Sequence, residues 1–434
     1  MDKMADVLGR AGAWCGQNKY LSAIKNAFQN FMPLTIAGAI GVLWCNVLVN
    51  DQTGLGLFFK PIMALDFLNP AFQAVNFCTI SCITVGITLG IAQEIGVWNM
   101  GAEKAGYIPG LVGLAAWLSV TNTSHMVEGA KEAFTGIAGN ELGATGLFTG
   151  MIIGVLSVEL FCFFEKQDAL KIKMPEQVPP GVARAFEVLV PATITLIITA
   201  CIGSACYNLT GLYLNDVIKN GIQGPLGAVG ATIPGVMIIY LVIMLFWLVG
   251  IHGNNMLSAV KEALFTPLAL ENVEKFNKGE KPTNIINMYF LQMCGEFGGS
   301  GVTIGLVIAI MIFGKREDNK AIASLSLVPG LFNINETVTF GVPMVLNPIL
   351  GIPFVVAPLI TIIIGYVLTV IGFCPVACLT VPWTTPPIVF GFLACGANVM
   401  GAVTQAILIV VSTVIYTPFL ISYEKYQNKQ AAEA

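Results

Sequence analysis

The sequence predicts an all-α membrane protein with about ten transmembrane helices, including re-entrant hairpins and broken helices in the C-terminal half. Three observations support this class: 56% of the 434 residues are hydrophobic, only 11% are charged, and the apolar residues fall in long runs. Soluble domains are usually about 25% charged. Runs near 20 residues are long enough to cross a hydrocarbon core of about 30 Å as helices. The alternating short strands of a membrane β-barrel are not evident.

The first half of the chain contains continuous apolar runs. They predict five spans, at Ala27–Val49, Phe72–Gln93, Tyr107–Val120, Leu142–Phe164 and Phe186–Tyr207. Lipid offers no partner to backbone amides, so each run should be a helix with internally satisfied hydrogen bonds. The opening segment, Met1–Asn26, is mixed and polar. This composition fits either an amphipathic helix on the membrane surface or a solvated cytoplasmic N-terminal segment. We expect residues 1–215 to form a scaffold.

Basic loops predict the orientation of the chain. The short loop Glu165–Arg184 carries three lysines and one arginine, and basic residues also lie at 315–320 and after Tyr423. Short loops rich in Lys and Arg stay on the cytoplasmic side of a membrane. We therefore expect both termini to be cytoplasmic, which requires an even number of spans.

The second half differs because Gly, Pro and polar clusters interrupt its apolar stretches. The interruptions lie at Gly250–Asn255, Gly295–Thr303, Pro329–Pro343 and Val381–Gly391. Non-helical backbone at membrane depth is tolerated where it is buried in protein or lines a wet cavity. Interrupted helices are also the best sequence indication of a transporter's binding site. We expect residues 216–434 to form the substrate-binding half.

Two ionisable residues in these interruptions are candidates for chemistry, because such groups are costly within a membrane. His252 precedes Gly253 and Asn254; the alternative is a histidine at a helix end near water. Glu336 follows Asn333 and Asn335 in an otherwise apolar stretch. Amides beside one carboxylate can bind hydroxyl groups, and the carboxylate can hold or remove a proton. The alternative, a carboxylate that caps a helix, does not account for the asparagines.

Glu296 and Trp383 are candidates for binding a sugar. Glu296 precedes a glycine-rich turn whose amides could hold a phosphate or sugar oxygen, although close helix packing explains the glycines equally well. Trp383 and Thr384 lie among prolines that forbid a continuous helix. An aromatic ring beside hydroxyls suits a pyranose. The alternative is a tryptophan at the membrane interface.

Other classes of site are not indicated. The chain has eleven cysteines, and the pairs Cys78/Cys82 and Cys374/Cys378 have helical spacing, but only two histidines accompany them. We interpret the cysteines as small apolar residues that pack, and we predict no metal and no cofactor. A Walker-type lysine, a Ser-His-Asp pattern and a basic face for nucleic acid are not visible.

Five segments carry a resemblance to a known family. They are KIKMPEQVPPGVARAF (171–186), HGNN (252–255), GGSGVTIGLV (298–307), NINETVTFGVPMVLNPILGIPF (333–354) and VPWTTPP (381–387). At these residues the chain resembles the membrane subunit, enzyme IIC, of the bacterial phosphotransferase system. The lactose/cellobiose/diacetylchitobiose branch is the most similar. One departure is Thr337, where the family commonly has proline.

The resemblance implies a homodimer in the bacterial cell (inner) membrane, with the N-terminal half forming much of the dimer contact. Each protomer would hold one disaccharide and carry it by an elevator-like movement. The C6 hydroxyl of the sugar would then be phosphorylated from a phosphocysteine on a separate enzyme IIB, which lies downstream of IIA, HPr and enzyme I. Glu336 and His252 would face that hydroxyl.

We therefore expect a transporter subunit that imports a β-linked disaccharide of the cellobiose, diacetylchitobiose or lactose type and takes part in phosphoryl transfer. Two alternatives stay open: a sugar carrier not coupled to phosphorylation, and an intramembrane enzyme that acts on a lipid. The predicted catalytic residues are Glu336 and His252. The predicted substrate-binding residues are Gly253, Asn254, Glu296, Asn333, Asn335, Trp383 and Thr384.

Overall fold

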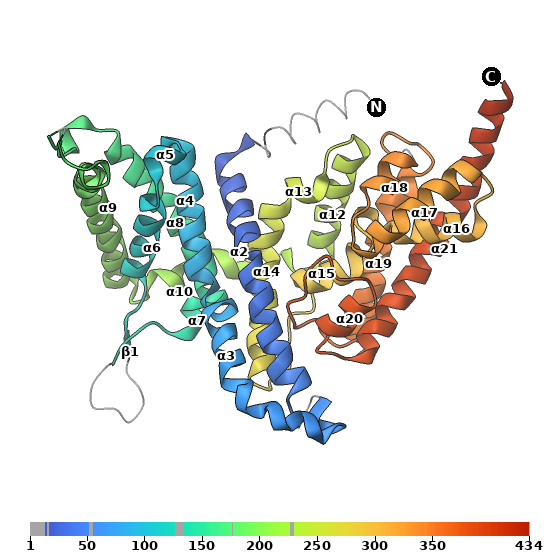
Figure 1. The fold of residues 1–434 in the computed structure, drawn as a ribbon, viewed down its shortest axis with the longest axis horizontal. Helices are drawn as coiled ribbons and strands as arrows, with labels where there is room; N and C mark the ends of the chain where they lie inside the picture. Colours follow the sequence, from blue (N-terminus) through green and yellow to red (C-terminus); the bar gives the residue numbers. More distant parts are fainter. Residues whose placement is uncertain are drawn as a thin grey trace. The chain divides into compact units, whose positions relative to one another are not determined.

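The computed structural model describes Trp14 and residues 17–433, except 52–54, 126–133, 176, 226–229 and 343. The described chain is mostly helical, as predicted (Figure 1). It also contains one two-stranded antiparallel sheet, in which β1 (Ser124–His125) pairs with β2 (Phe134–Thr135). The predicted surface helix at Met1–Asn26 lies largely outside the described residues.

Several helices can cross a membrane. Six in the described chain are long and apolar enough: Lys19–Leu48, Lys60–Met100, Ala144–Glu165, Pro180–Thr210, Gly351–Val370 and Val399–Gln430. The bent pair Met288–Val302 and Ile304–Phe313, with 59° between its parts, would make a seventh. Two further apolar helices, Ile108–Val120 and Ile233–Leu248, are shorter than the others. The predicted count of about ten is therefore not confirmed.

The described chain divides into two compact units. The first comprises Gln17–Gly38 and Ala74–Gly227, and the second comprises Ala39–Gln73 and Ala228–Ala434. Two helices contribute to both units, α2 (Lys19–Leu43) and α3 (Asn69–Cys78). The roles expected for the two halves, a scaffold and a substrate-binding half, stay predictions.

The first unit is a bundle around three helices: α4 (Ile83–Met100), α6 (Ile108–Val120) and α8 (Ala144–Glu165). These helices approach closely because small residues face one another. A Cβ on Gly113 of α6 would lie 2.3 Å from the Cβ of Ala92, and a Cβ on Gly150 of α8 would lie 2.2 Å from Oγ1 of Thr88. The remaining elements are η4 (Ile80–Cys82), α5 (Ala102–Ala105), α7 (Gly139–Leu142), η5 (Asp168–Leu170), α9 (Pro180–Thr210), α10 (Leu214–Ile218) and η6 (Lys219–Gln223).

The second unit is built around α21 (Val399–Glu433), which packs against α16 (Ile304–Phe313), α19 (Gly351–Val370) and α20 (Val389–Ala394) (Figure 1). The Tyr416 hydroxyl of α21 donates a hydrogen bond to the Gly301 carbonyl at 2.8 Å. The remaining elements are η1 (Trp44–Leu48), η2 (Leu55–Leu57), η3 (Lys60–Leu68), α12 (Ile233–Leu248), α13 (Gly253–Met256), α14 (Ser258–Asn277), α15 (Met288–Gly295), η7 (Ser300–Val302), α17 (Glu317–Leu331) and α18 (Glu336–Gly341).

Helices of the second unit end or begin within each of the four polar stretches. The α12 helix ends at Leu248 and α13 begins at Gly253; α15 ends at Gly295 and α16 begins at Ile304. Likewise, α17 ends at Leu331 and α18 begins at Glu336. Irregular backbone follows α19, and α20 begins at Val389. The re-entrant arrangement of these pieces stays a prediction.

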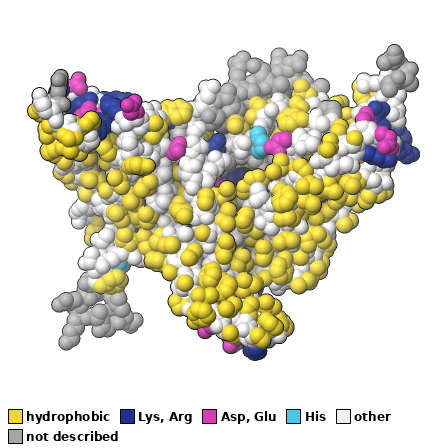
Figure 2. All heavy atoms as spheres, viewed as in Figure 1, with side chains coloured by type: hydrophobic (Ala, Val, Ile, Leu, Met, Phe, Trp, Pro, Cys, Tyr) yellow, Lys and Arg dark blue, Asp and Glu magenta, His cyan; other side chains and the backbone are white. Residues whose placement is uncertain are grey.

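The surface is largely apolar. Figure 2 shows hydrophobic side chains over much of the visible face, with charged side chains in small groups. Many large hydrophobic residues are more than half exposed, among them Ile312, Leu325 and Val414. Lipid removes the cost that water would impose on such a surface.

Candidate functional site

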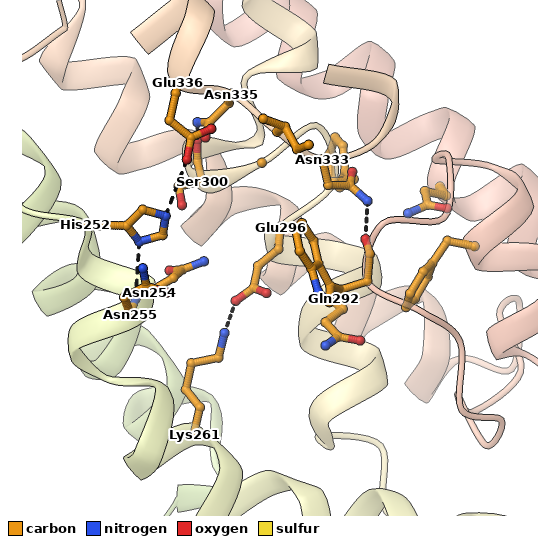
Figure 3. A pocket seen from close by; sticks show the side chains of 16 residues that line it. His252, Asn254, Asn255, Lys261, Gln292, Glu296, Ser300, Asn333, Asn335 and Glu336 are labelled. Atoms are coloured by element: carbon orange, nitrogen blue, oxygen red, sulfur yellow. Dashed lines mark hydrogen bonds and ion pairs between the residues drawn. The ribbon is translucent and has the colours of Figure 1, made fainter. Parts of the chain in front are cut away.

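The second unit contains a cavity of about 210 Å³ that all four polar stretches line (Figure 3). Its walls come from α13, α14, α15, α18, α20 and α21, from the turn at 296–300, and from the segments before α13, α18 and α20. The lining residues are His252, Asn254, Asn255, Lys261, Gln292, Glu296, Phe297, Gly299, Ser300, Asn333, Ile334, Asn335, Glu336, Trp383, Phe390 and Gln405. Irregular backbone therefore lies beside a polar cavity, as expected of a binding site.

His252 is held in one orientation by its own helix. It precedes α13, and its Nδ1 accepts a hydrogen bond from the Asn255 backbone N–H at 3.2 Å. The ring also packs against the buried indole of Trp247, with centroids 4.4 Å apart. Because a backbone N–H can only donate, Nδ1 carries no proton in this arrangement. Neutral His252 therefore carries its proton on Nε2.

Glu336 faces that nitrogen. Its Oε1 lies 3.8 Å from Nε2 of His252, and both side chains are partly exposed (Figure 3). The pair thus presents a donor and an acceptor side by side. A hydroxyl group placed between them could accept a hydrogen bond from His252 and donate one to Glu336.

The protonation of His252 should make both the stability of the protein and its affinity for ligand depend on pH. Burial lowers the pKa of His252 from its ordinary 6.5, and the carboxylate of Glu336 opposes that shift. Because the folded pKa lies below the unfolded one, the unfolded chain takes up the proton first as pH falls, and stability decreases below about pH 6.5. We expect ligand affinity to fall as pH drops through the lowered pKa of His252 in the folded protein, since a proton on Nδ1 would break the bond to Asn255.

Binding measured by calorimetry between about pH 5 and 8 checks this expectation. The control is His252→Gln, which should bind more weakly and show no such acid dependence. An acid decline that persists unchanged in His252→Gln would assign it to another group.

Asn333 joins three of the polar stretches. Its Oδ1 accepts a hydrogen bond from the Gly298 backbone N–H at 2.6 Å, and its Nδ2 donates to the carbonyls of Trp383 and Thr385. Its backbone has a φ of +62°, a conformation that asparagine adopts more readily than most residues. The amide predicted to bind a ligand hydroxyl is thus engaged with backbone groups.

Replacing Asn333 with Ala should loosen the segment that carries Trp383. Three backbone groups would lose a partner, at a cost of about 3 kcal/mol in the free energy of unfolding. Thermal unfolding of the purified protein and tryptophan fluorescence measure the effect. Asn333→Asp, which keeps one acceptor, should lie between Ala and wild type. Wild-type stability in Asn333→Ala would show that these bonds do not hold the segment.

Asn335 is also engaged with backbone. It is 4% exposed and its Nδ2 donates to the Ser300 carbonyl at 2.7 Å. Gly299 lies against it, since a Cβ there would be 2.6 Å from the Cβ of Asn335. Asn335 therefore places Glu336 relative to the glycine-rich turn.

Two predicted residues do not line the cavity. Gly253 is packed closely against α12, where an added Cβ would lie 2.0 Å from the Ile243 carbonyl oxygen. Thr384 adjoins Trp383 but is not among the lining residues. His252, Asn254, Glu296, Asn333, Asn335, Glu336 and Trp383 do line it.

Several lining residues escaped the sequence reasoning, notably Lys261, Gln292 and Gln405. Lys261 forms an ion pair with Glu296. Gln405 accepts hydrogen bonds from the backbone N–H groups of Ile388 and Gly391 and so holds the start of α20. Polar residues within α15 and α21 were the available signal for the two glutamines. In the described part of the chain, no cluster of three or more His, Cys, Asp or Glu residues could hold a metal ion.

Comparisons with known proteins agree on one family. Residues 25–358 match the family described as Phosphotransferase system, EIIC. The oligo-beta-mannoside-specific EIIC component of the PTS system of Bacillus subtilis (strain 168) is 32% identical, over 98% of this chain and 94% of its own length. The cellobiose-specific EIIC component of Lactococcus lactis subsp. lactis (strain IL1403) is 29% identical, over 98% of each chain.

A solved structure has the same fold. It is the crystal structure of the transporter ChbC, the IIC component from the N,N′-diacetylchitobiose-specific phosphotransferase system. The TM-score is 0.88 at 29% sequence identity, over 97% of each chain. With this similarity and the apolar helices described above, the chain belongs to the phosphotransferase system EIIC family, as an integral membrane sugar permease of its cellobiose/lactose group.

Proposed function

We propose that this permease imports a β-linked disaccharide and presents the C6 hydroxyl of that sugar to a phosphorylated EIIB protein. EIIC components work with a sugar and an EIIB, and the similar proteins are named for β-mannosides, cellobiose and diacetylchitobiose. The observation that carries the proposal is the pairing of His252 with Glu336 at 3.8 Å beside the cavity.

The chemistry assigned to this pair is the activation of one hydroxyl. Glu336 accepts the proton of the C6 hydroxyl as its oxygen attacks the phosphorus of the EIIB phosphocysteine. A P–O bond forms, the S–P bond breaks, and the EIIB cysteine leaves as a thiolate. Nε2–H of His252 donates to the attacking oxygen and orients it, which matters because phosphoryl transfer depends on an aligned nucleophile.

The rest of the cavity would hold the sugar rings. Trp383 is 44% exposed and offers an aromatic face on which a pyranose can stack. Asn254 and Glu296 offer polar groups to ring hydroxyls. Asn333, Asn335, Gly253 and Thr384 contribute by shaping the segments that carry these groups.

We further propose that the permease works as a homodimer, with residues 1–215 as scaffold and residues 216–434 moving in an elevator-like step. Both termini would be cytoplasmic, so that EIIB, charged through IIA, HPr and enzyme I, reaches the loaded site from that side. The basic residues near 315–320 and after Tyr423 support this orientation.

The identity of the product tests the proposed chemistry. Purified permease, phosphorylated EIIB and cellobiose are incubated together, and the sugar is analysed by phosphorus–proton NMR. The expected product is cellobiose phosphorylated at one C6 hydroxyl. Unmodified cellobiose, with EIIB still phosphorylated, would contradict the proposal.

A further inference from the structure

A buried ion pair forms one wall of the cavity, and the phosphoryl-transfer step does not use it. Nζ of Lys261 pairs with Oε1 of Glu296, and the Tyr240 hydroxyl donates a hydrogen bond to the same oxygen at 2.7 Å. Lys261 is 6% exposed, and its Nζ lies 5.7 Å from the centre of the Tyr240 ring. Side chains from α12 and α14 thus converge on one oxygen of a carboxylate that directly follows α15.

A buried ion pair of this kind adds little to the stability of the fold. Removing two charges from water costs several kcal/mol for each ion, and well-packed apolar residues of similar size are often as stable. A pair that lines a cavity beside substrate-binding groups is more readily explained by a role toward the ligand. The geometry of Glu296 indicates which role.

The two oxygens of the Glu296 carboxylate are not equivalent. Oε1 accepts hydrogen bonds from both Lys261 and Tyr240, whereas Oε2 has no hydrogen-bond donor among the described residues. Two residues that line the cavity, Gln292 and Asn254, each have a side-chain oxygen that is buried without a partner in the described chain. Oε2 of Glu296 is therefore a fixed acceptor that calls for a hydroxyl donor on the ligand.

The charges of the cavity also favour a neutral ligand rich in hydroxyl groups. Lys261 neutralises Glu296, while Glu336 faces His252, which its lowered pKa keeps neutral near pH 7. The lining thus carries one surplus negative charge. An acidic substituent on the ligand would be repelled, and a neutral sugar rich in hydroxyls would not.

We propose that Glu296, held by Lys261 and Tyr240, is a specificity-determining acceptor for one free hydroxyl of the disaccharide. This hydroxyl differs from the one at Glu336, because the Glu296 carboxylate turns toward Lys261 and away from Glu336 (Figure 3). The substrate is then a neutral disaccharide that leaves this hydroxyl unsubstituted. The inference rests on the proposed function, since it requires a sugar in this cavity.

The selection follows from the cost of an unpaired charged acceptor. A ligand that lacks the hydroxyl leaves Oε2 desolvated and without a donor. Sites built to hydrogen-bond a substrate hydroxyl reject analogues without it far more strongly than apolar pockets reject a missing methylene. Lys261 and Tyr240 act as positioning residues, because they fix Oε1 and leave Oε2 facing the ligand.

The test is a set of binding measurements on the full-length protein in detergent, with cellobiose and its monodeoxy analogues. Glu296→Gln alone would leave Lys261 buried and unpaired, which destabilises the fold. The informative variant is therefore Glu296→Gln with Lys261→Met, which removes both charges and keeps the volume. Tyr240→Phe is the matched control that removes one donor and neither charge.

In wild type, at least one deoxy analogue should bind more weakly than cellobiose, by about tenfold or more. In the double variant, cellobiose itself should weaken by a similar factor, and that analogue should lose nothing further. Tyr240→Phe should weaken cellobiose binding by less than the double variant does. The deoxy analogue should still bind this variant more weakly than cellobiose does. The disaccharide acid with a carboxylate at one C6 should bind wild type about tenfold or more weakly than cellobiose.

Two results would overturn the inference in distinguishable ways. If every deoxy analogue carries the same penalty in wild type and in the double variant, Glu296 does not select a hydroxyl, while the proposed function stands. If no disaccharide binds wild type at all, the proposed function fails, and this inference fails with it.

Discussion

Glu336→Gln lowers the rate of sugar phosphorylation by EIIB by at least about 100-fold, because the glutamine amide cannot accept the hydroxyl proton. The side chain is half-exposed and, in the described chain, forms no ion pair with a lysine or arginine, so the exchange leaves no buried charge unpaired. Single-turnover transfer from phosphorylated EIIB to cellobiose measures the rate. Calorimetry on the same variant measures sugar affinity, which should change by about tenfold or less.

The matched control for this variant is Glu274→Gln, which removes an exposed carboxylate paired with Lys278 in the same unit. It should phosphorylate sugar at the wild-type rate. If Glu336→Gln transferred the phosphoryl group at the wild-type rate, Glu336 would take no part in the reaction, whatever the affinity of the variant for sugar.

Gly299→Ala should disrupt the cavity from its backbone side, with a loss of about 3 kcal/mol or more in the free energy of unfolding. Gly299 has a φ of +90°, and an added Cβ would lie 2.6 Å from both Cβ and Cγ of Asn335. That contact would displace the segment that leads into Glu336. We expect both a lower Tm and a loss of sugar binding of about tenfold or more, measured by thermal unfolding and calorimetry.

Gly279→Ala separates backbone strain from this contact. Gly279 has a φ of +73°, and a Cβ there would meet nothing within 4 Å. That variant should lose about 1 kcal/mol of stability from strain and bind sugar normally. Equal effects of the two variants on sugar affinity would show that the contact with Asn335 does not shape the site.

The sequence predicted which residues line the cavity better than it predicted their contacts. Interruptions in the apolar pattern pointed to His252, Glu336 and Trp383, because broken helices at membrane depth need a reason. The same reasoning treated Asn333 and Asn335 as ligand-binding amides. Their hydrogen bonds go to backbone groups 35 to 52 residues away in the chain, which no local pattern reveals.

Lys261 was missed for a related reason. It begins the charged pair Lys261–Glu262 within α14, whose mixed composition is typical of a solvated helix. Its burial depends on Glu296, a partner that directly follows α15 and lies 35 residues later. Periodicity reports which residues share a helix face, but not which face meets a distant carboxylate.

The number of full spans stays a prediction. The helices α6 and α12 are strongly apolar, yet they have 13 and 16 residues, whereas a full crossing takes about 20. An apolar helix buried within a bundle has the same composition as one that faces lipid. Length and packing in the folded chain separate the two cases.

The dependence of uptake on phosphorylated EIIB tests whether this permease couples transport to phosphorylation. Proteoliposomes that contain the permease are loaded with phosphorylated EIIB, cellobiose is added outside, and the internal sugar is identified over time. We expect cellobiose phosphate to accumulate inside, and we expect omission of EIIB, or Glu336→Gln, to abolish its formation. Free cellobiose entering at an unchanged rate without EIIB would contradict coupled transport and would identify an uncoupled carrier.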